Sequence, residues 1–206
     1  LYQLNQKCGE LFEITKKWRD AKNSYLSIGD ITSVARVVHL WSEEGYQYEY
    51  PLFFARTYLS FLVNRLIPQA TAFFRAATDD YLDSYEFTLQ HEQEQQLQQS
   101  QQSLQVQQVQ IHNKYYSIWQ MCIIINDLLG LMDTPSIATK INPAKIYQLV
   151  LSKFEKILKF YDENLYQMAV IIGHKVFHIP EDQSNSLNNA PNPMQMISKL
   201  FGGNSF

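Results

Sequence analysis

The chain has 206 residues, of which 46% are hydrophobic, and it carries 17 Lys or Arg against 20 Asp or Glu, a net charge of −3. This length and apolar content suit one folded domain or an array of helical pairs, and they exclude global disorder. Because the net charge is slightly negative and the basic residues are scattered singly, the composition provides no bulk attraction to nucleic acid or anionic lipid.

The cysteines and the longest apolar run indicate the cellular compartment of the protein. The two cysteines, Cys8 and Cys122, are too few and too far apart for a disulfide framework, and buried reduced thiols in a cytosolic protein are expected. The longest apolar run, from Ile118 to Met132, has about 15 residues, fewer than the roughly 20 of a membrane span. Because the chain begins at Leu1 rather than Met, we expect a fragment of a longer cytosolic protein.

Helical periodicity dominates the first 82 residues. Gly29 is a C-cap signal and Asp30 an N-cap signal, and Pro51 and Pro68 suit the first turns of two later helices. Bulky apolar residues recur every three or four positions, which predicts five helices. The first has Leu4, Leu11, Phe12 and Ile14; the second covers 18–27; the third has Val34, Val37, Val38 and Trp41; the fourth has Leu52, Phe53, Ala55, Tyr58, Leu59 and Leu62; the fifth has Ala70, Phe73, Phe74 and Ala77.

An internal repeat occurs within these helices. Three positions recur with a shift of 49 residues: Phe12, Ala21 and Tyr25 become Phe61, Ala70 and Phe74. In helix pairs of the tetratricopeptide kind, a small residue permits close backbone approach while an aromatic residue fills the neighbouring gap. The shift exceeds the roughly 34 residues of a regular tetratricopeptide array, which favours an all-α, irregular α-solenoid over a compact bundle with coincidental spacing.

Residues 90–110 interrupt the helical pattern, because 12 of these 21 positions are Gln. The flanks of this tract alternate between apolar and polar residues, which predicts a β-hairpin over 83–112 with a long Gln-rich loop and a bulge at 107–108. The alternating apolar residues are Tyr85, Phe87 and Leu89 on one side and Leu104, Val106, Val109 and Ile111 on the other. One continuous Gln-rich helix, with Leu97, Leu104 and Ile111 at heptad spacing, is the alternative.

Helices resume after the tract. One is expected over 113–131, followed by a loop over 133–142, and Asn142 with Pro143 opens another helix. The apolar positions of that helix are Ile146, Val150, Phe154, Ile157 and Tyr161. A last helix is expected over 164–177. The predicted organisation is therefore helical repeats at 1–82, the hairpin at 83–112, C-terminal helices at 113–179, and a tether with a short apolar tail at 180–206.

The chain lacks the motifs of catalysis. His174 and His178 are four positions apart, as in zinc-binding helices, but no glutamate lies between them, and ordinary helix-end histidines are the favoured interpretation. Adjacent acidic residues such as Glu43 and Glu44 point about 100° apart on a helix and do not converge. No GxSxG or Gly-rich phosphate loop is present. The sequence therefore predicts a non-enzymatic protein without metal or cofactor; a helical metal protein or enzyme is the weakest alternative.

The surplus of aromatic residues indicates partner-facing surfaces. An isolated hairpin is marginal in water and must pack on something, either a partner or its own solenoid. The predicted partner contacts are Tyr85, Phe87, Leu89, Val106, Val109 and Ile111.

Several stretches resemble the Golgi-to-ER traffic protein four family, the α-solenoid adaptor of the guided-entry pathway for tail-anchored membrane proteins. They are Leu11–Ser27, Gly45-Tyr46, Glu49, Leu52–Arg56, Val176–Pro180 and Met194–Gly203, and they occur in the family's order over most of the chain. The glutamine tract departs from the family, which has a short hairpin there.

The resemblance implies a cytosolic adaptor with helical pairs, one hairpin between late helices, and no contact with nucleic acid or insertion into a membrane. It implies that the C-terminal half binds a ubiquitin-like-domain partner, or a larger chaperone scaffold in animals. The targeting ATPase would bind N-terminal repeats that we expect to be missing from this chain. A helical-repeat scaffold subunit of another complex, of the proteasome-lid or translation-factor type, is the alternative.

Overall fold

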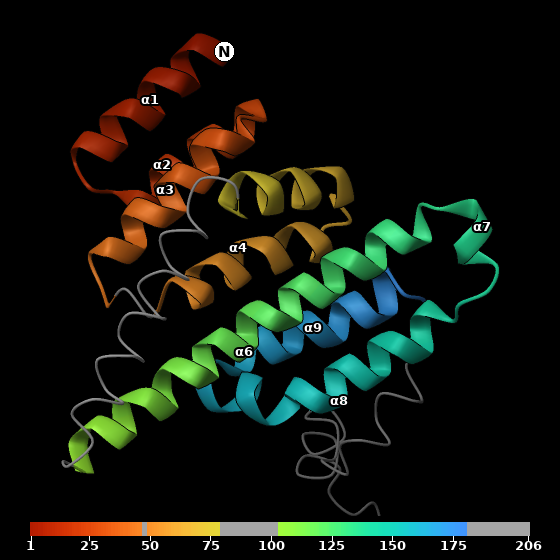
Figure 1. Ribbon diagram of the computed structural model, residues 1–206. Helices are drawn as coiled ribbons and strands as arrows, with labels where there is room; N and C mark the ends of the chain where they lie inside the picture. Colours follow the sequence, from red (N-terminus) through yellow and green to blue (C-terminus); the bar gives the residue numbers. More distant parts are fainter. Residues whose placement is uncertain (47–48, 79–102, 181–206) are drawn as a thin grey trace, which may run out of the picture.

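The computed structural model describes residues 1–46, 49–78 and 103–180, with the side chains of 103–114 and 138 outside the description. Within these ranges all regular structure is helical and no strand occurs, which confirms the all-α prediction (Figure 1). Among the described residues, no helix has both the length and the apolar character needed to cross a membrane.

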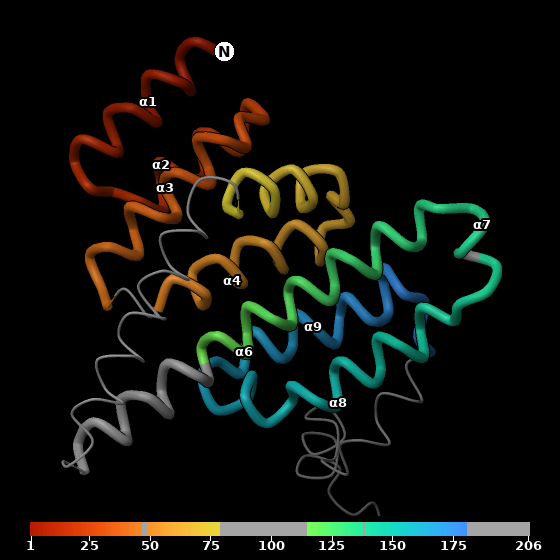
Figure 2. Tube along the Cα trace, in the orientation of Figure 1, coloured from red at the N-terminus to blue at the C-terminus, as the bar shows by residue number. Residues whose placement is uncertain are grey.

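The N-terminal helices follow one another in space as they do in sequence. Helix α1 (Tyr2–Ile14) packs on α2 (Trp18–Ile28), α2 on α3 (Ile31–Glu43), and α3 on α4 (Tyr50–Val63), as the tube in Figure 2 shows. A further helix over 67–78 lies beside α4. All five predicted N-terminal helices are therefore present.

The C-terminal helices return to α4. Helix α6 (Ser103–Met132) packs on α4 and also on α8 (Pro143–Tyr161), and α9 (Glu163–Lys175) packs on α4 and α8. A single turn, α7 (Pro135–Ala138), lies in the segment predicted to be a loop. Helix α4 is consequently covered by helices that precede it in the sequence and by helices that follow it, and ten of its fourteen residues are buried.

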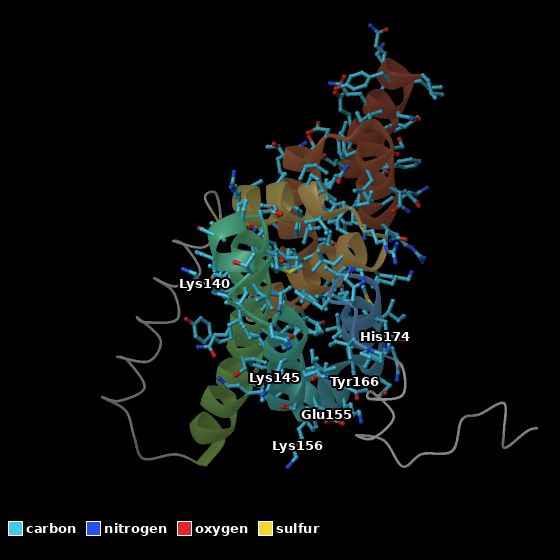
Figure 3. The ribbon with its side chains drawn as sticks, turned by 90° about the vertical axis from the view of Figure 1, so that its right-hand side faces the viewer. Lys140, Lys145, Glu155, Lys156, Tyr166 and His174 are labelled. Carbon is cyan, nitrogen blue, oxygen red and sulfur yellow. The ribbon has the colours of Figure 1, made fainter. Side chains whose placement is uncertain are left out.

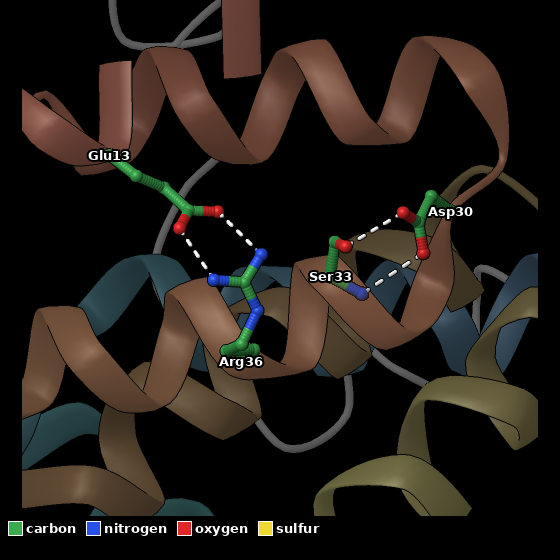
Figure 4. Close-up of polar contacts among 4 residues, drawn as sticks. All are labelled: Glu13, Asp30, Ser33 and Arg36. Carbon is green, nitrogen blue, oxygen red and sulfur yellow. Dashed lines mark hydrogen bonds and ion pairs between the residues drawn. The ribbon is translucent and has the colours of Figure 1, made fainter. Parts of the chain in front are cut away.

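The predicted capping signals act as expected. Gly29 has φ of +74° at the end of α2, a conformation that costs glycine little. The Asp30 carboxylate accepts hydrogen bonds from the backbone N–H of Ser33, at 3.1 Å, and from its hydroxyl, at 2.7 Å (Figure 4). The Asn142 side chain accepts a hydrogen bond from the backbone N–H of Lys145 at the start of α8.

An aromatic cluster centred on Phe54 joins three helices. The Phe54 ring lies 4.3 Å from Trp119 of α6, 5.1 Å from Phe73, 5.7 Å from Phe74 and 5.8 Å from Tyr58, between ring centroids. Each such pair adds about 0.5–1.5 kcal/mol beyond the burial of area. This cluster therefore ties α4 and the helix at 67–78 to α6.

Five of the six residues of the 49-residue repeat are buried, and the sixth, Phe12, is partly buried. Ala21 and Ala70 are both fully buried, and Tyr25 and Phe74 are 2% and 9% exposed. Gly9 of α1 corresponds to Tyr58 of α4, and a Cβ on Gly9 would lie 2.7 Å from Cζ of Tyr25. The ring of Tyr25 thus lies against the backbone of α1 at Gly9, where a larger residue would require the ring or the helix to move.

The hairpin prediction is wrong over its second half. Residues 104–111 belong to helix α6, which begins at Ser103, so the predicted boundary between 112 and 113 falls inside a helix. Gln has a good helix propensity, and no Gly or Pro occurs from Ser103 to Leu129. Extending an existing helix requires no new nucleation, so these turns form easily at the start of a well-packed helix. The first flank, at 85–89, lies outside the described residues, as does the predicted tail at 181–206.

Candidate protein-binding surfaces

The predicted partner contacts are only partly within the described structure. Tyr85, Phe87 and Leu89 lie outside it. The backbone of 106–111 is described and is helical, so the two-residue alternation that grouped Val106, Val109 and Ile111 on one side of a strand does not apply. Their role in binding a partner stays a prediction.

Helix α1 presents an exposed apolar face. Leu4, Leu11 and Ile14, expected on the apolar side of an amphipathic helix, are 61%, 58% and 81% exposed, whereas Gly9 is buried and Phe12 is partly buried. The helix is therefore confirmed, but its largest aliphatic side chains point away from α2. The sequence signal for this orientation is the need to place Gly9, the smallest residue, at the closest contact.

An ion pair fixes α1 relative to α3. The Glu13 carboxylate accepts two hydrogen bonds from the Arg36 guanidinium, one of them 2.8 Å from Oε1 to Nη2 (Figure 4). The same guanidinium lies 6.0 Å from the centroid of the Tyr25 ring. Burial, together with the hydrogen bond and charge of Glu13, raises the pKa of Tyr25 to about 12. These contacts hold the exposed face of α1 in a defined orientation.

Helix α8 has an inner apolar face and an outer basic face. Val150 and Phe154, which were predicted at apolar positions, lie on the inner face, where Tyr147, Leu151 and Leu158 are also buried. The outer face, which we name the α8 stripe, consists of Lys145, Leu149, Lys153, Lys156 and Phe160. All five are exposed, and Leu149 and Phe160 reach 64% and 72%. Figure 3 shows Lys145 and Lys156 on this side of the molecule.

The α8 stripe was not predicted, because apolar periodicity identifies the side of a helix that fills a core and not the opposite side. Leu149 and Phe160 are absent from the predicted apolar positions of the helix. Both lie on the same side of the helix as the lysines, opposite the buried Tyr147, Leu151 and Leu158. An apolar residue on the polar side of an amphipathic helix is a candidate contact residue.

Buried ionisable groups are held in their neutral forms. Burial raises the pKa values of the Cys122 thiol and the Tyr147 hydroxyl, and also that of Tyr58. The Tyr147 hydroxyl donates a hydrogen bond to the carbonyl oxygen of Ala169, at 2.8 Å. Because a thiol reacts as its thiolate, Cys122 is unsuited to nucleophilic attack at neutral pH.

The two histidines at the end of α9 do not form a pair on one helical face. Helix α9 ends at Lys175, and His178 follows it with φ of +55°. His174 Nδ1 lies 2.7 Å from the carbonyl oxygen of Ile179, so this nitrogen carries the proton. Within the described ranges, no group of three or more His, Cys, Asp or Glu side chains could hold a metal ion.

The arrangement therefore offers surfaces for other macromolecules on α1 and α8. Comparison of the chain with protein-family models, with curated proteins and with solved structures gave no match in any of the three.

Proposed function

We propose that this protein is a non-enzymatic cytosolic adaptor in the delivery of tail-anchored membrane proteins, and that it holds a ubiquitin-like-domain partner and links it to the targeting ATPase. The sequence resemblance from Leu11 to Ser27 and at the later stretches supports this pathway. In this proposal the helices form an irregular α-solenoid of tetratricopeptide-like pairs.

The observation that carries the proposal is the shared packing of two helix pairs. Ala21 and Tyr25 in α2 are buried, and so are Ala70 and Phe74, 49 residues later. Small residues that let helices approach, each followed by a buried aromatic four positions on, are the packing units of helical-repeat scaffolds. Such scaffolds bind partners on extended surfaces, and the exposed apolar residues of α1 and α8 are compatible with that use.

The partner surface in this proposal includes the first turns of α6. Val106 and Val109 are three positions apart in the helix, so one partner element can contact both. Burial of each side chain against a partner contributes about 1.5–3 kcal/mol, so the two can determine whether the complex is stable.

The test is binding of the purified chain to the ubiquitin-like-domain protein of the guided-entry pathway from the same cells. Size-exclusion chromatography with light scattering should show a small heteromer. The double variant Val106→Asp and Val109→Asp should weaken binding by at least about tenfold, because each substitution places a charge in an apolar contact. Circular dichroism should show that the variant keeps its helical content.

The matched control is Leu66→Asp, an apolar-to-acidic change at a 41% exposed position outside α1, α6 and α8, which should leave binding within about twofold of the parent. Equal binding by parent and double variant would remove α6 from the interface. Failure to bind that partner, together with co-purification in a large particle, would replace the proposal by the proteasome-lid or translation-factor type of scaffold.

A further inference from the structure

The five positions of the α8 stripe form one continuous face. They are separated by four, four, three and four residues, so they stay within one side of the helix. From Lys145 to Phe160 the face is about 22 Å long at 1.5 Å per residue. Its inner counterpart is buried against α6 and α9, so α8 is held rigidly and presents the stripe outward.

Charge is concentrated on this face against the overall balance of the chain. Residues 140–161 contain five Lys and one Glu, although the whole chain carries a net charge of −3. The single glutamate, Glu155, is already engaged: it accepts a hydrogen bond from Lys159 Nζ at 2.7 Å. Lys159 Nζ also lies 4.3 Å from the centroid of the Tyr166 ring. Lys159 is thus neutralised within the fold.

The three lysines of the stripe lack a carboxylate partner, although Lys153 Nζ lies 5.3 Å from the centroid of the Phe154 ring. No carboxylate in the described part of the chain pairs with Lys145, Lys153 or Lys156. Lys153 and Lys156 are three positions apart on the helix, where like charges repel. A ligand that brings negative charge to this face would relieve that repulsion.

Leu149 and Phe160 give the stripe two apolar anchor points. They are eleven residues apart, which is three helical turns or about 16 Å along the axis. Apolar residues at positions i, i+4, i+7 and i+11 of a second helix cover the same length. Lys153 and Lys156 lie between the two anchors, so acidic residues beside the apolar positions of a partner helix would meet them.

We propose that the α8 stripe is a docking site for an acidic amphipathic helix of a partner protein. The proposal goes beyond the adaptor function above, because it concerns α8 rather than residues 85–111 and does not depend on the pathway. A single helix is about 10–12 Å wide and contacts only the stripe. Outside 140–161 the described residues include eleven Lys or Arg and eleven Asp or Glu, so an extended anionic surface, such as a membrane or nucleic acid, would gain no net attraction beyond this face.

Binding is measured with a fluorescent 16-residue probe peptide made of Glu and Ala, with Leu at positions 3, 7, 10 and 14. The peptide should bind the full chain saturably, and the same peptide with Lys in place of Glu should not. Lys153→Glu with Lys156→Glu should weaken binding at least about tenfold, and Leu149→Gln about fivefold. These residues are exposed, so the melting temperature should be nearly unchanged.

The matched control is Lys7→Glu with Arg19→Glu, which makes the same change in net charge at exposed positions of α1 and α2. It should leave binding within about twofold of the parent. Equal weakening by the two double variants, or no binding of the acidic peptide, would overturn the proposal.

Two further probes distinguish other occupants. A peptide of residues 79–94 contains six carboxylates and no Lys or Arg; binding tighter than that of the designed helix would assign the stripe to the chain's own acidic segment instead. Vesicles with 30% phosphatidylserine that sediment with the parent, but not with the Lys153→Glu and Lys156→Glu variant, would assign it to a membrane. Either result would overturn docking of a partner helix.

Discussion

At the scale of single residues, the contact between Gly9 and Tyr25 decides how closely α1 approaches α2. The ring of Tyr25 occupies the space that a Cβ on Gly9 would need. At the position shifted by 49 residues the chain has Tyr58, whose ring meets the edge of Phe74 at 5.7 Å. At this position the α1–α2 pair therefore has a glycine, which leaves room for the Tyr25 ring. The pair of α4 and the helix at 67–78 has a contact between two aromatic rings instead.

Gly9→Ala should destabilise the protein, by about 1–2 kcal/mol, even though Ala is the better helix former. A methyl group 2.7 Å from Cζ forces the Tyr25 ring or the helix to move, and the ring is held by the Arg36 and Glu13 contacts. Urea unfolding followed by circular dichroism measures the change.

The matched control is Gly130→Ala in α6, where an added Cβ meets nothing within 4 Å. This variant should be more stable than the parent by up to about 1 kcal/mol, because only the helix propensity changes. A Gly9→Ala variant as stable as Gly130→Ala would show that α1 does not depend on the close approach.

Residues with a local physical role were the easiest to predict. Gly29, Asp30 and Asn142 act on their own backbone within a few positions, so sequence alone identifies them. Gly9 was missed because a lone helical glycine usually signals only a weaker helix. The pattern Gly-x2-Phe followed by Ala-x3-Tyr, at Gly9, Phe12, Ala21 and Tyr25, matches tetratricopeptide spacing and could have identified it.

At the scale of helices, Asp162 connects α8, α9 and α4. It ends α8, and its carboxylate accepts a hydrogen bond from the backbone N–H of Asn164 at the start of α9. The same carboxylate accepts a hydrogen bond from Arg56 Nε of α4, at 2.9 Å. This ion pair connects residues 106 positions apart in the sequence.

Asp162→Ala should cost about 1–2 kcal/mol of stability, and Asn142→Ala, which removes only a helix cap, about 1 kcal/mol. The difference, about 0.2–1 kcal/mol, is the contribution of the partly exposed ion pair with Arg56. A double-mutant cycle with Arg56→Ala isolates it by urea unfolding. A coupling energy of zero would assign the whole effect of Asp162 to the cap.

The boundaries of α6 show where element prediction failed. The alternation at 104–111 rested on four apolar residues in a Gln-rich stretch, a weaker cue than the continuous helix that follows. Two-residue and helical periodicities are hard to separate over so short a run. The alternative of a Gln-rich helix was correct for the part that begins at Ser103.

At the scale of the whole molecule, we expect a helix that packs on several others to resist local opening better than one that packs on a single neighbour. Helix α1 packs chiefly on α2 and leaves Leu4, Leu11 and Ile14 exposed, whereas α4 contacts helices on both sides. Periodicity in the sequence identified nearly all helices but could not place α9 on α4, because that pairing depends on residues about a hundred positions apart.

Hydrogen exchange measured by mass spectrometry should therefore show a gradient. Amides of α1 should exchange at least about tenfold faster than those of α4, because α1 can open locally without exposing the Phe54 cluster. Arg36→Ala should speed exchange in α1 and leave α4 unchanged, and the exposed Arg19→Ala should change neither. Equal protection of α1 and α4 would mean that the whole protein opens as one unit.

The burial of α4 also has a consequence for biosynthesis. Part of its burial is provided by α9, which leaves the ribosome about a hundred residues later. At about 5–20 residues per second, the side of α4 that faces α9 stays uncovered for roughly 5–20 s. During that interval apolar side chains of α4 are open to water and to other proteins, although ten of its fourteen residues are buried in the finished protein.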